Sequence, residues 1–517
     1  MKNWIEGIYN HQTEEKGEKM AIKIIMLVIF FGVMIGVGVY CRRHATDVNG
    51  FVLGGRNVGP WLTAFAYGTS YFSAVIFIGY AGQFGWKFGL ASTWIGLGNA
   101  FIGSLLAWNV LGRRTRTMSH HLESKTMPEF FGVRFDSKML KILASLIVFV
   151  FLIPYTASLY NGLSRLFGMA FNLDYTVCIV VMAVLTGIYV IAGGYMATAI
   201  NDFIQGCIMI IGIIAVIASV LKSNGGFMQA IDVLARVEDA QATSTPGAFA
   251  SFFGPDPFGL LCVVILTSLG TWGLPQMVQK FYAIKDEKSI GKGTLISTIF
   301  AIIVAGGCYF LGGFGRLYDI DIAAQGYDAI IPAMIEKLSP FLIAVVVILV
   351  LSASMSTLSS LVLASSSTLT LDMIRGTIMK EMTEKKQVFI MRIFIVVFIA
   401  ISAVIAVVQY KSGVTFIAQL MGISWGALAG AFLAPFIYSL YWKGVTKAAV
   451  LVNFLFGSGI MVANMLARAS FPTILQSPIN CGAFAMLAGL LIVPVVSLIT
   501  PKLSDEKKQA VFSCYEK

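Results

Sequence analysis

The most informative part of the sequence spans residues 338–371 and reads LSPFLIAVVVILVLSASMSTLSSLVLASSSTLTL. It has no charged residue and is longer than the roughly 20 apolar residues that a membrane-spanning helix needs. A run of hydroxyl residues, ASMSTLSS at 353–360, interrupts it near the middle. The stretch therefore predicts a membrane-spanning helix with a polar centre.

The rest of the chain has the same apolar character. Its 517 residues are 57% hydrophobic and only 12% charged, against about 25% charged in ordinary soluble proteins, and the mean hydropathy is +0.82. Helices are the expected spanning elements, because lipid offers no water to exposed backbone groups. We predict an all-α polytopic membrane protein with about thirteen spans near residues 21–41, 60–84, 89–112, 141–165, 172–195, 203–221, 258–279, 294–315, 338–371, 388–409, 414–441, 448–467 and 480–500.

The loop charges predict the orientation. Lys and Arg gather in connections that alternation of sides places on one face, at 113–138, 280–292, 375–386 and 502–508. Positive residues favour the cytoplasmic side, so we expect the N-terminus outside, the C-terminus inside, and Lys280 in a cytoplasmic loop. Arginines rather than a small-residue cleavage site follow the first span, which predicts a retained helix. The protein is thus placed in the cell membrane.

The hydroxyl run in 338–371 is the strongest candidate for chemistry. Helical spacing puts Ser356, Ser359 and Ser360 on one flank, and Ala353 one turn before Thr357. Hydroxyl and carbonyl oxygens suit a hard cation such as sodium. The alternative is that these small residues only pack helices closely.

Two other spans are interrupted in a similar way. AYGTSYFSA at 66–74 and TSLGTWGLP at 267–275 place glycine, hydroxyl residues and, in the second, proline inside apolar runs. Broken helices of this kind expose carbonyls and helix ends that hold ions and substrates in transporters. Glycine and proline are also simply common in membrane helices, so structural kinks are the alternative.

Five further features need interpretation. Asp202 is a functional carboxylate or a helix N-cap, Tyr155 is an aromatic wall for a ligand or core packing, and Gln83 lies at a span end and favours a loop or interfacial position. The connection 223–257 is expected to be an outer surface loop that covers the carrier. Gly422, Gly426 and Gly430 are interpreted as packing residues.

Several function classes are disfavoured. The seven cysteines have no metal or redox spacing, and the four histidines, His11, His44, His120 and His121, all fall in predicted loops, so no enzyme activity is predicted. Neither nucleic-acid binding nor a protein partner has support. The polar interruptions inside apolar spans favour a membrane transporter. A membrane enzyme and a membrane sensor with a transporter fold are the alternatives.

Four motifs occur in a specific order along the chain: LGGRNVGP at 53–60, TMPEFF at 126–131 followed by Arg134-Phe135, Gly193-Gly194 leading to Asp202 and Gln205, and MSTLSS at 355–360. Over roughly residues 20–500 they resemble the sodium:solute symporter family. The resemblance implies a leucine-transporter-type core of two inverted five-helix repeats, with the first and sixth core helices broken at 60–84 and 258–279.

The resemblance also implies the ion sites. The main sodium site would use the carbonyls of Thr69, Phe72 and Ala353 and the hydroxyls of Ser356 and Thr357. A second sodium, present in some relatives, would use Asp202, Ser356, Ser359 and Ser360. Sodium is the only cofactor expected, although protons could partly replace it.

The resemblance divides the chain into seven parts: an extracellular leader (1–20), an extra helix and loop (21–59), the first core repeat (60–221), an outer loop (222–257), the second core repeat (258–442), two peripheral helices (443–500) and a cytoplasmic tail (501–517).

The substrate implied is a small organic solute, first of all an amino acid such as proline. The chain departs from the proline-carrier pattern at Tyr71, Thr267 and Thr271, and Ile95 stands where sugar carriers have a glutamate. Organic anions or monocarboxylates, sialic acid and, less favoured, sugars are the alternatives. The candidate substrate residues are Ser70, Tyr71, Gln83, Tyr155, Thr271, Trp272 and Gln276.

Overall fold

The computed structural model describes residues 2–171, 173–375, 379, 381–412 and 417–516. The secondary-structure elements of these residues are all helices, and no β-strand is formed among them. The first positions of the predicted spans 172–195 and 414–441 lie outside the described residues.

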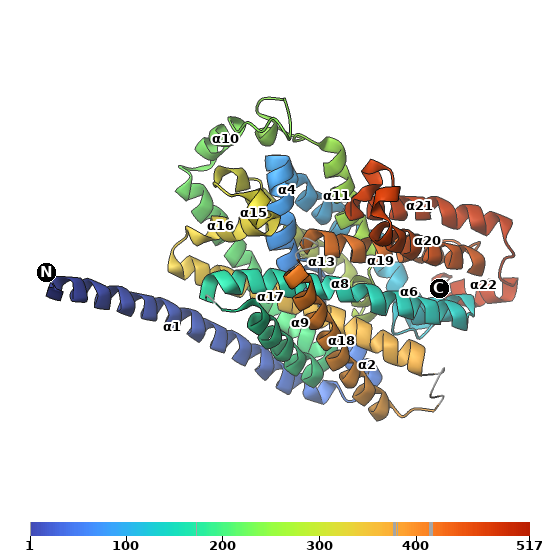
Figure 1. The fold of residues 1–517 in the computed structure, drawn as a ribbon. Helices are drawn as coiled ribbons and strands as arrows, with labels where there is room; N and C mark the ends of the chain where they lie inside the picture. The colour runs from blue at the N-terminus through green and yellow to red at the C-terminus, as the bar shows by residue number, and fades with distance from the viewer. Residues whose placement is uncertain (1, 172, 376–378, 380, 413–416, 517) are drawn as a thin grey trace.

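Long helices form the body of the molecule (Figure 1). They are α1 (Lys2–Cys41), α8 (Lys138–Phe171), α9 (Tyr175–Ser223), α13 (Glu287–Ala301), α17 (Pro340–Thr368), α18 (Glu384–Ser412), α19 (Ile417–Tyr441), α20 (Lys447–Leu466) and α21 (Pro478–Ile499). The shorter ones are α2 (Val48–Leu53), α3 (Pro60–Tyr71), α4 (Ala81–Phe88), α5 (Thr93–Gly98), α6 (Arg113–His121), α7 (Met127–Phe135), α10 (Phe227–Ala235), α11 (Pro257–Leu269), α12 (Pro275–Ala283), α14 (Gly307–Gly312), α15 (Ile322–Gln325), α16 (Ile330–Glu336) and α22 (Asp505–Phe512).

The described part of the chain has ten helices long and apolar enough to cross a membrane, or up to eleven if a bent pair counts as one span. Thirteen therefore stays a prediction. The difference lies partly in α9, whose 49 residues include both predicted spans 172–195 and 203–221 and lose helical geometry at Gly194, with φ 57°. A straight helix of that length would be roughly 70 Å long, more than twice the thickness of the hydrocarbon core.

The two interruptions expected from the sequence are present. Helix α3 ends at Tyr71, and Phe72 is extended with φ −86° and ψ 124°. The second break is at Leu274, with φ −84° and ψ 122°, where the helical segment ending at Gly273 and α12 meet at 46°. Both breaks lie inside the protein, since Phe72 and Leu274 are fully buried.

Helix α17 occupies the centre. From Val346 to Thr368 every residue is buried, and α17 packs against α9, α8 and α3. Near it, α19 packs against α20 and α21 through the glycines interpreted as packing residues: a Cβ on Gly426 would lie 2.8 Å from the Cα of Gly482. The hydroxyl run is thus held among helices rather than exposed to lipid.

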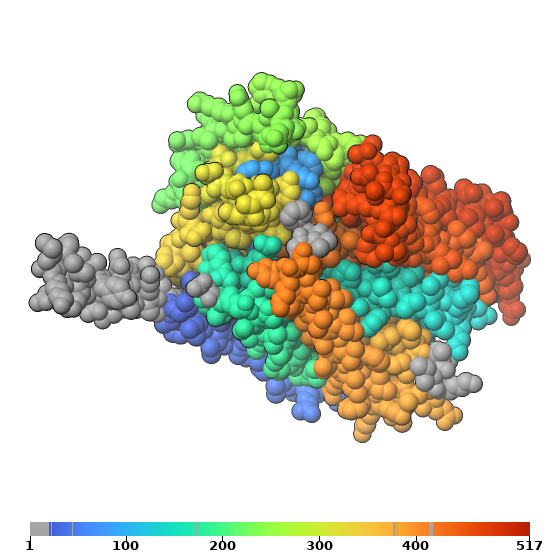
Figure 2. All heavy atoms as spheres, in the orientation of Figure 1, coloured from blue at the N-terminus to red at the C-terminus, as the bar shows by residue number. Residues whose placement is uncertain are grey.

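The connection 223–257 is more structured than the predicted surface loop, because it contains α10. Asp239 forms an ion pair of 3.0 Å with Arg316, and Trp94 donates a hydrogen bond of 2.9 Å to the carbonyl of Phe252. Figure 2 shows the atoms of this connection, in green, beside the yellow segment that follows Arg316. The connection is therefore anchored at both of its halves.

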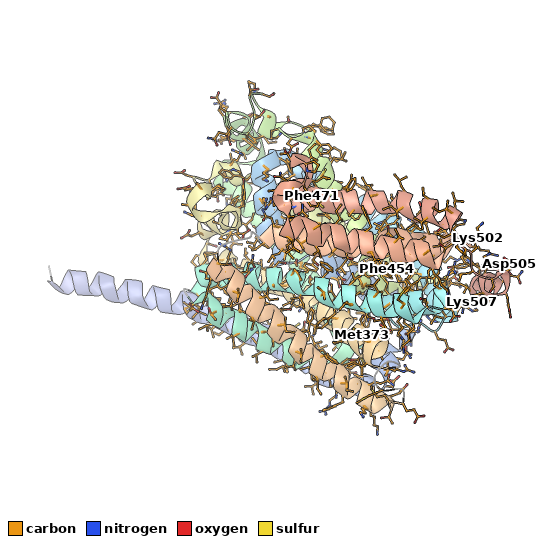
Figure 3. The ribbon with its side chains drawn as sticks, turned by 45° about the vertical axis from the view of Figure 1, so that its right-hand side comes forward. Met373, Phe454, Phe471, Lys502, Asp505 and Lys507 are labelled. Carbon is orange, nitrogen blue, oxygen red and sulfur yellow. The ribbon has the colours of Figure 1, made fainter. Side chains whose placement is uncertain are left out.

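The two ends of the chain lie at opposite ends of the molecule (Figure 1). In Figure 3, Lys502, Asp505 and Lys507 lie together beyond one end of the α20 and α21 pair, whereas Phe471 lies toward the other end. Helix α22 packs back on this end, where the Phe512 ring lies 4.9 Å from the Arg134 guanidinium.

Candidate functional site

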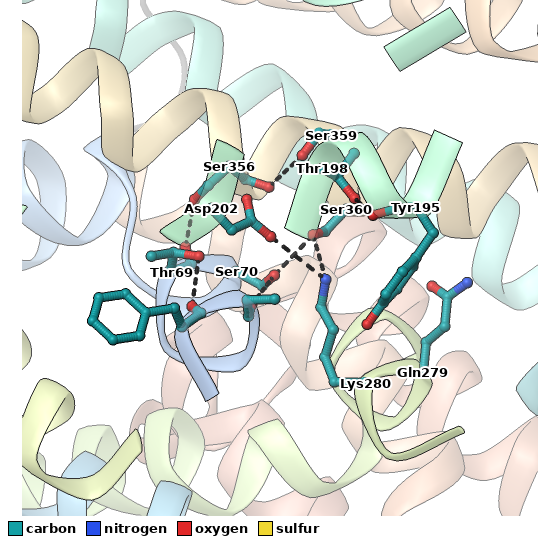
Figure 4. A network of polar contacts seen from close by, with 12 residues as sticks. Thr69, Ser70, Tyr195, Thr198, Asp202, Gln279, Lys280, Ser356, Ser359 and Ser360 are labelled. Carbon is teal, nitrogen blue, oxygen red and sulfur yellow. Dashed lines mark hydrogen bonds and ion pairs between the residues drawn. The ribbon is translucent and has the colours of Figure 1, made fainter. Parts of the chain in front are cut away.

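The break after α3 faces the hydroxyl run of α17 (Figure 4). A helix end leaves its last carbonyl groups without partners in a following turn. Here Ser356 Oγ lies 2.9 Å from the carbonyl oxygen of Thr69, and Thr357 Oγ1 lies 3.2 Å from the same oxygen. Thr357 Oγ1 is also 3.3 Å from the Phe72 carbonyl.

Ala353 completes this group from within α17. Its carbonyl lies 3.2 Å from Ser356 Oγ and 3.1 Å from Thr357 Oγ1. The structure therefore brings together all five atoms that the sequence assigned to the main sodium site, and all five residues are fully buried.

The oxygen set fits a small hard cation. Oxygens about 2.4 Å from a shared cation of calcium-like size, at right angles around it, lie about 3.4 Å apart. The hydroxyl-to-carbonyl distances of 2.9 to 3.3 Å are slightly shorter, because the hydroxyls donate to the carbonyls. A bound ion would make the lone pairs of these hydroxyl and carbonyl oxygens point toward it. This change needs little movement of α3 or α17.

A second polar network lies one turn further along α17 (Figure 4). Ser360 Oγ lies 2.8 Å from Ser70 Oγ and accepts a hydrogen bond of 3.0 Å from Lys280 Nζ. Lys280 Nζ is also 3.9 Å from Asp202 Oδ2. Four segments of the chain thus meet at one buried ion pair.

One expectation about this network is wrong, and one of the two alternatives for Asp202 is excluded. Lys280 is not a loop residue: it lies within α12 and is 2% exposed. Asp202 is not an N-cap, since it lies well inside α9 and beyond the break at Gly194. The wrong placement of Lys280 comes from treating charged residues as markers of helix ends.

The four residues predicted for a second sodium have different partners. Asp202 and Ser360 face Lys280, Ser359 Oγ donates 2.8 Å to the Ser356 carbonyl, and Ser356 takes part in the first oxygen group. A lysine ammonium therefore lies where part of the second ligand set was expected.

The predicted substrate residues separate into two groups. Ser70, Thr271 and Trp272 use their polar atoms internally: Thr271 Oγ1 donates to Ser268 at 2.9 Å, and Trp272 Nε1 donates to Ile102 at 3.0 Å. By contrast, Tyr71 and Tyr155 each carry a buried hydroxyl with no hydrogen-bond partner in the described structure, and Gln276 has such an amide. Of these six residues, only those of the second group have free hydrogen-bonding capacity among the described groups.

Gln83 is placed differently from the sequence interpretation. It is not a loop residue, since it lies within α4 and is 3% exposed. It lies roughly 16 Å along the chain beyond the break. Its amide oxygen also lacks a hydrogen-bond partner in the described part of the protein.

Trp425 of α19 was missed by the sequence analysis. Its ring centroid is 6.0 Å from that of Tyr71 and 5.9 Å from that of Tyr155. A Cβ on Gly270, just before the second break, would lie 3.1 Å from the same indole. Trp425 therefore joins both broken helices to α8. A lone tryptophan in an apolar span carries no signal that could have identified it.

Comparisons with known proteins agree with this architecture. Residues 51–457 match the profile of the sodium:solute symporter family. The osmoregulated proline transporter OpuE of Bacillus subtilis (strain 168) is 28% identical over 490 residues, covering 93% of this chain and 96% of the relative. The sodium/proline symporter of Staphylococcus aureus (strain JH9) is 28% identical over 498 residues, covering 94% of this chain and 93% of the relative.

The fold also has relatives among solved structures. A Na+-coupled sialic acid symporter in a substrate-bound outward-open state matches with a TM-score of 0.72 at 16% identity, covering 93% of this chain and 99% of that one. The inward-facing conformation of Mhp1 matches with a TM-score of 0.50 at 13% identity, covering 88% of this chain and 94% of that one. These identities support the fold alone.

The family profile and the curated relatives confirm the resemblance noted in the sequence. The family and its curated relatives are transporters and not enzymes, which agrees with the prediction of no enzyme activity. Membership of this family implies Na+ as the coupling ion and a small molecule as the solute. Together with the apolar helices, the family and its relatives make this a multi-pass membrane protein. The chain belongs to the sodium:solute symporter family.

Proposed function

We propose that the protein takes up a small zwitterionic solute, with proline as the first candidate, in symport with sodium bound between α3 and α17. The observation that carries the proposal is the convergence of the Thr69 carbonyl with the hydroxyls of Ser356 and Thr357. The site joins a broken helix to an unbroken one. An ion that holds these two helices together favours the conformation in which they meet.

The aromatic cluster is the proposed solute pocket. The cluster consists of Tyr71, Tyr155 and Trp425. Tyr71 lies at the first break, and Trp425 contacts both tyrosines and lies beside the second break. Two unpaired tyrosine hydroxyls give it polar groups on apolar walls, as in most small-molecule sites. Gln276, next to the second break, adds an unpaired amide. Gln83 is left out, since it lies farther along the helix.

Proline rests on the relatives. The Bacillus and Staphylococcus proteins named above carry proline in their names, but Tyr71, Thr267 and Thr271 depart from the proline-carrier pattern. Another zwitterion or an organic anion is the alternative within the same mechanism.

The proposed architecture has thirteen spans with two inverted five-helix repeats at 60–221 and 258–442. Three additions raise the span count from ten to thirteen. Helix α9 is divided at Gly194, the stretch Val75–His121 is divided at Gly89, and the bent pair counts as one span. Residues 21–59 would precede the core and 443–500 would follow it as peripheral helices.

The proposed orientation puts the leader, 1–20, and the outer loop, 222–257, outside and the tail, 501–517, inside. The lysines of the tail lie at the opposite end of the molecule from the chain's start (Figures 1 and 3). Sodium binding from outside would favour an outward-open state. Movement of the broken helices against α17 and α9 would then release the sodium ion and the organic solute to the cytoplasm.

Uptake of labelled proline into sealed proteoliposomes tests the proposal. An inward sodium gradient is compared with choline and potassium gradients, and unlabelled amino acids, carboxylates and sugars are added as competitors. We expect accumulation only with sodium. Proline uptake that is equal in choline would contradict sodium coupling, and competition by a different solute would replace proline. A membrane sensor would give no net accumulation of any of them.

A further inference from the structure

We infer that Lys280 is a built-in cation that takes the place of a second sodium ion, so that the protein binds a single Na+ per transport cycle. This inference rests on the proposed sodium symport. It concerns the network one turn away from the main site, at Asp202 and Ser360.

The position of the ammonium group supports the inference. Lys280 Nζ lies 3.0 Å from Ser360 Oγ and 3.9 Å from Asp202 Oδ2. Its third neighbour is the ring of Tyr195, with the centroid 5.0 Å away. An alkali cation at this place would use the same carboxylate and the same hydroxyl. Figure 4 shows the lysine side chain reaching from α12 between these groups.

The local charge balance leaves no attraction for a further cation. Lys280 is the only ion-pair partner that Asp202 has among the described side chains, and Asp202 is fully buried. One buried carboxylate compensates one buried cation, whereas a sodium ion added beside Lys280 would be an unpaired charge in a poorly solvated site. The ammonium and the ion therefore compete for one position.

A tethered cation differs from a bound one in a measurable way. It cannot leave with the substrate, so it adds nothing to the coupling to the sodium gradient. It also lies on the half-helix that follows the second break, and through Ser360 it is linked to Ser70 on the first broken helix. The same charge that occupies the ion position thus connects the two broken helices.

Direct counting of bound sodium tests the inference. The full-length protein in detergent is equilibrated with radiolabelled Na+ in a choline background, and saturable binding is measured for the wild type, Lys280→Ala, Lys280→Gln and Lys280→Arg. We expect one Na+ per chain in the wild type and Lys280→Arg. Lys280→Ala and Lys280→Gln should bind two, with a Hill coefficient that rises from about 1 toward 2.

A double variant locates the new ion. Adding Asp202→Asn to Lys280→Ala should return the count to one, because the carboxylate is removed. If Lys280→Ala is monodisperse only in sodium and not in choline, the inference is supported, since sodium would be replacing the lost ammonium. Two Na+ per wild-type chain, or a single Na+ in both Lys280→Ala and Lys280→Gln, would overturn it.

Thr357→Ala separates this inference from the proposed function. It should weaken the main site, so that at sodium concentrations that just saturate the wild type the otherwise wild-type chain loses most of its bound sodium and the Lys280→Ala chain keeps one ion. A wild type that binds no sodium at all would contradict the proposed symport itself. A wild type that binds two would contradict only the role of Lys280.

Discussion

Each of the hydroxyls of Ser356 and Thr357 has more than one buried carbonyl within hydrogen-bond distance. Ser356 Oγ and Thr357 Oγ1 share the carbonyls of Thr69 and Ala353. Further along the same helix, Ser366 Oγ donates 3.2 Å to the carbonyl of Leu363 within its own turn. The first two hydroxyls connect α17 to another element, and the third does not.

We predict that Ser356→Ala and Thr357→Ala raise the sodium concentration for half-maximal uptake by roughly 5- to 150-fold, the equivalent of about 1 to 3 kcal/mol for a lost buried oxygen ligand. Ser366→Ala, equally buried, should change it little. The measurement is initial uptake against sodium concentration in proteoliposomes. Equal effects at all three positions would mean that the hydroxyls only pack the helix.

Gln276 and Gln279 form a matched pair on α12. Gln276 has no partner for its amide among the described groups, whereas Gln279 Nε2 donates 2.9 Å to the carbonyl of Val52. We predict that Gln276→Leu raises KM for the solute about tenfold and leaves the melting temperature unchanged, since no protein hydrogen bond is lost. Gln279→Leu should reduce the free energy of unfolding by about 1 kcal/mol and so lower the melting temperature, while KM stays unchanged. The reverse pattern would exclude Gln276 from the pocket.

At the scale of elements, the sequence identified both helix breaks because a break inside an apolar span needs glycine or hydroxyl residues, which stand out there. It also identified the main oxygen group, since the family motif fixes its members. It could not show that Lys280 faces Asp202, because that pairing joins positions far apart in the chain. A lysine at the end of an apolar run gives the same sequence pattern whether its side chain is exposed to water or buried in the protein.

Close contact between helices depends on particular glycines. A Cβ on Gly85 of α4 would lie 2.0 Å from the carbonyl oxygen of Gly312 in α14, whereas one on Gly291 of α13 would meet no atom within 4 Å. We predict that Gly85→Ala destabilises the protein by about 1 to 3 kcal/mol, as overpacking does. Gly291→Ala should be neutral or stabilising, because alanine favours helix. Thermal unfolding in detergent measures both, and equal melting temperatures would refute the close contact.

One of the two anchors of the connection 223–257 is the ion pair of Asp239 with Arg316, which has a defined pH dependence. Partial burial tends to raise the pKa of Asp239, but the hydrogen bond and charge of Arg316, with the amides of Gln241 and Ala242, lower it overall. A lowered folded-state pKa means that the contact stabilises the fold above about pH 4, the ordinary value for Asp. The stabilisation is lost as the pH falls through the lowered value.

We therefore predict that limited proteolysis within 223–257 is slow and constant from pH 5 to 8 and faster in Asp239→Asn across that range. Cleavage by an acid-active protease should accelerate in the wild type only below about pH 4. If the wild type and Asp239→Asn are cleaved at the same rate at neutral pH, the ion pair does not anchor the connection.

In the molecule as a whole, the proposed ion site and the proposed solute pocket share one element. Thr69 and Phe72 present carbonyls to α17, and Tyr71 between them faces Trp425. Occupation of either site therefore fixes the same break in α3. Two ligands that stabilise one conformation strengthen each other's binding by an equal factor.

The most direct test of this coupling measures that factor in both directions. Proline binding to the purified protein is measured over a series of sodium concentrations, and sodium binding over a series of proline concentrations, in a choline background. We predict that saturating sodium tightens proline binding by the same factor, at least fivefold, by which saturating proline tightens sodium binding. At the sodium concentration that saturates the wild type, Thr357→Ala should reduce both effects. Proline affinity that is unchanged by sodium would contradict sodium-coupled symport at this site.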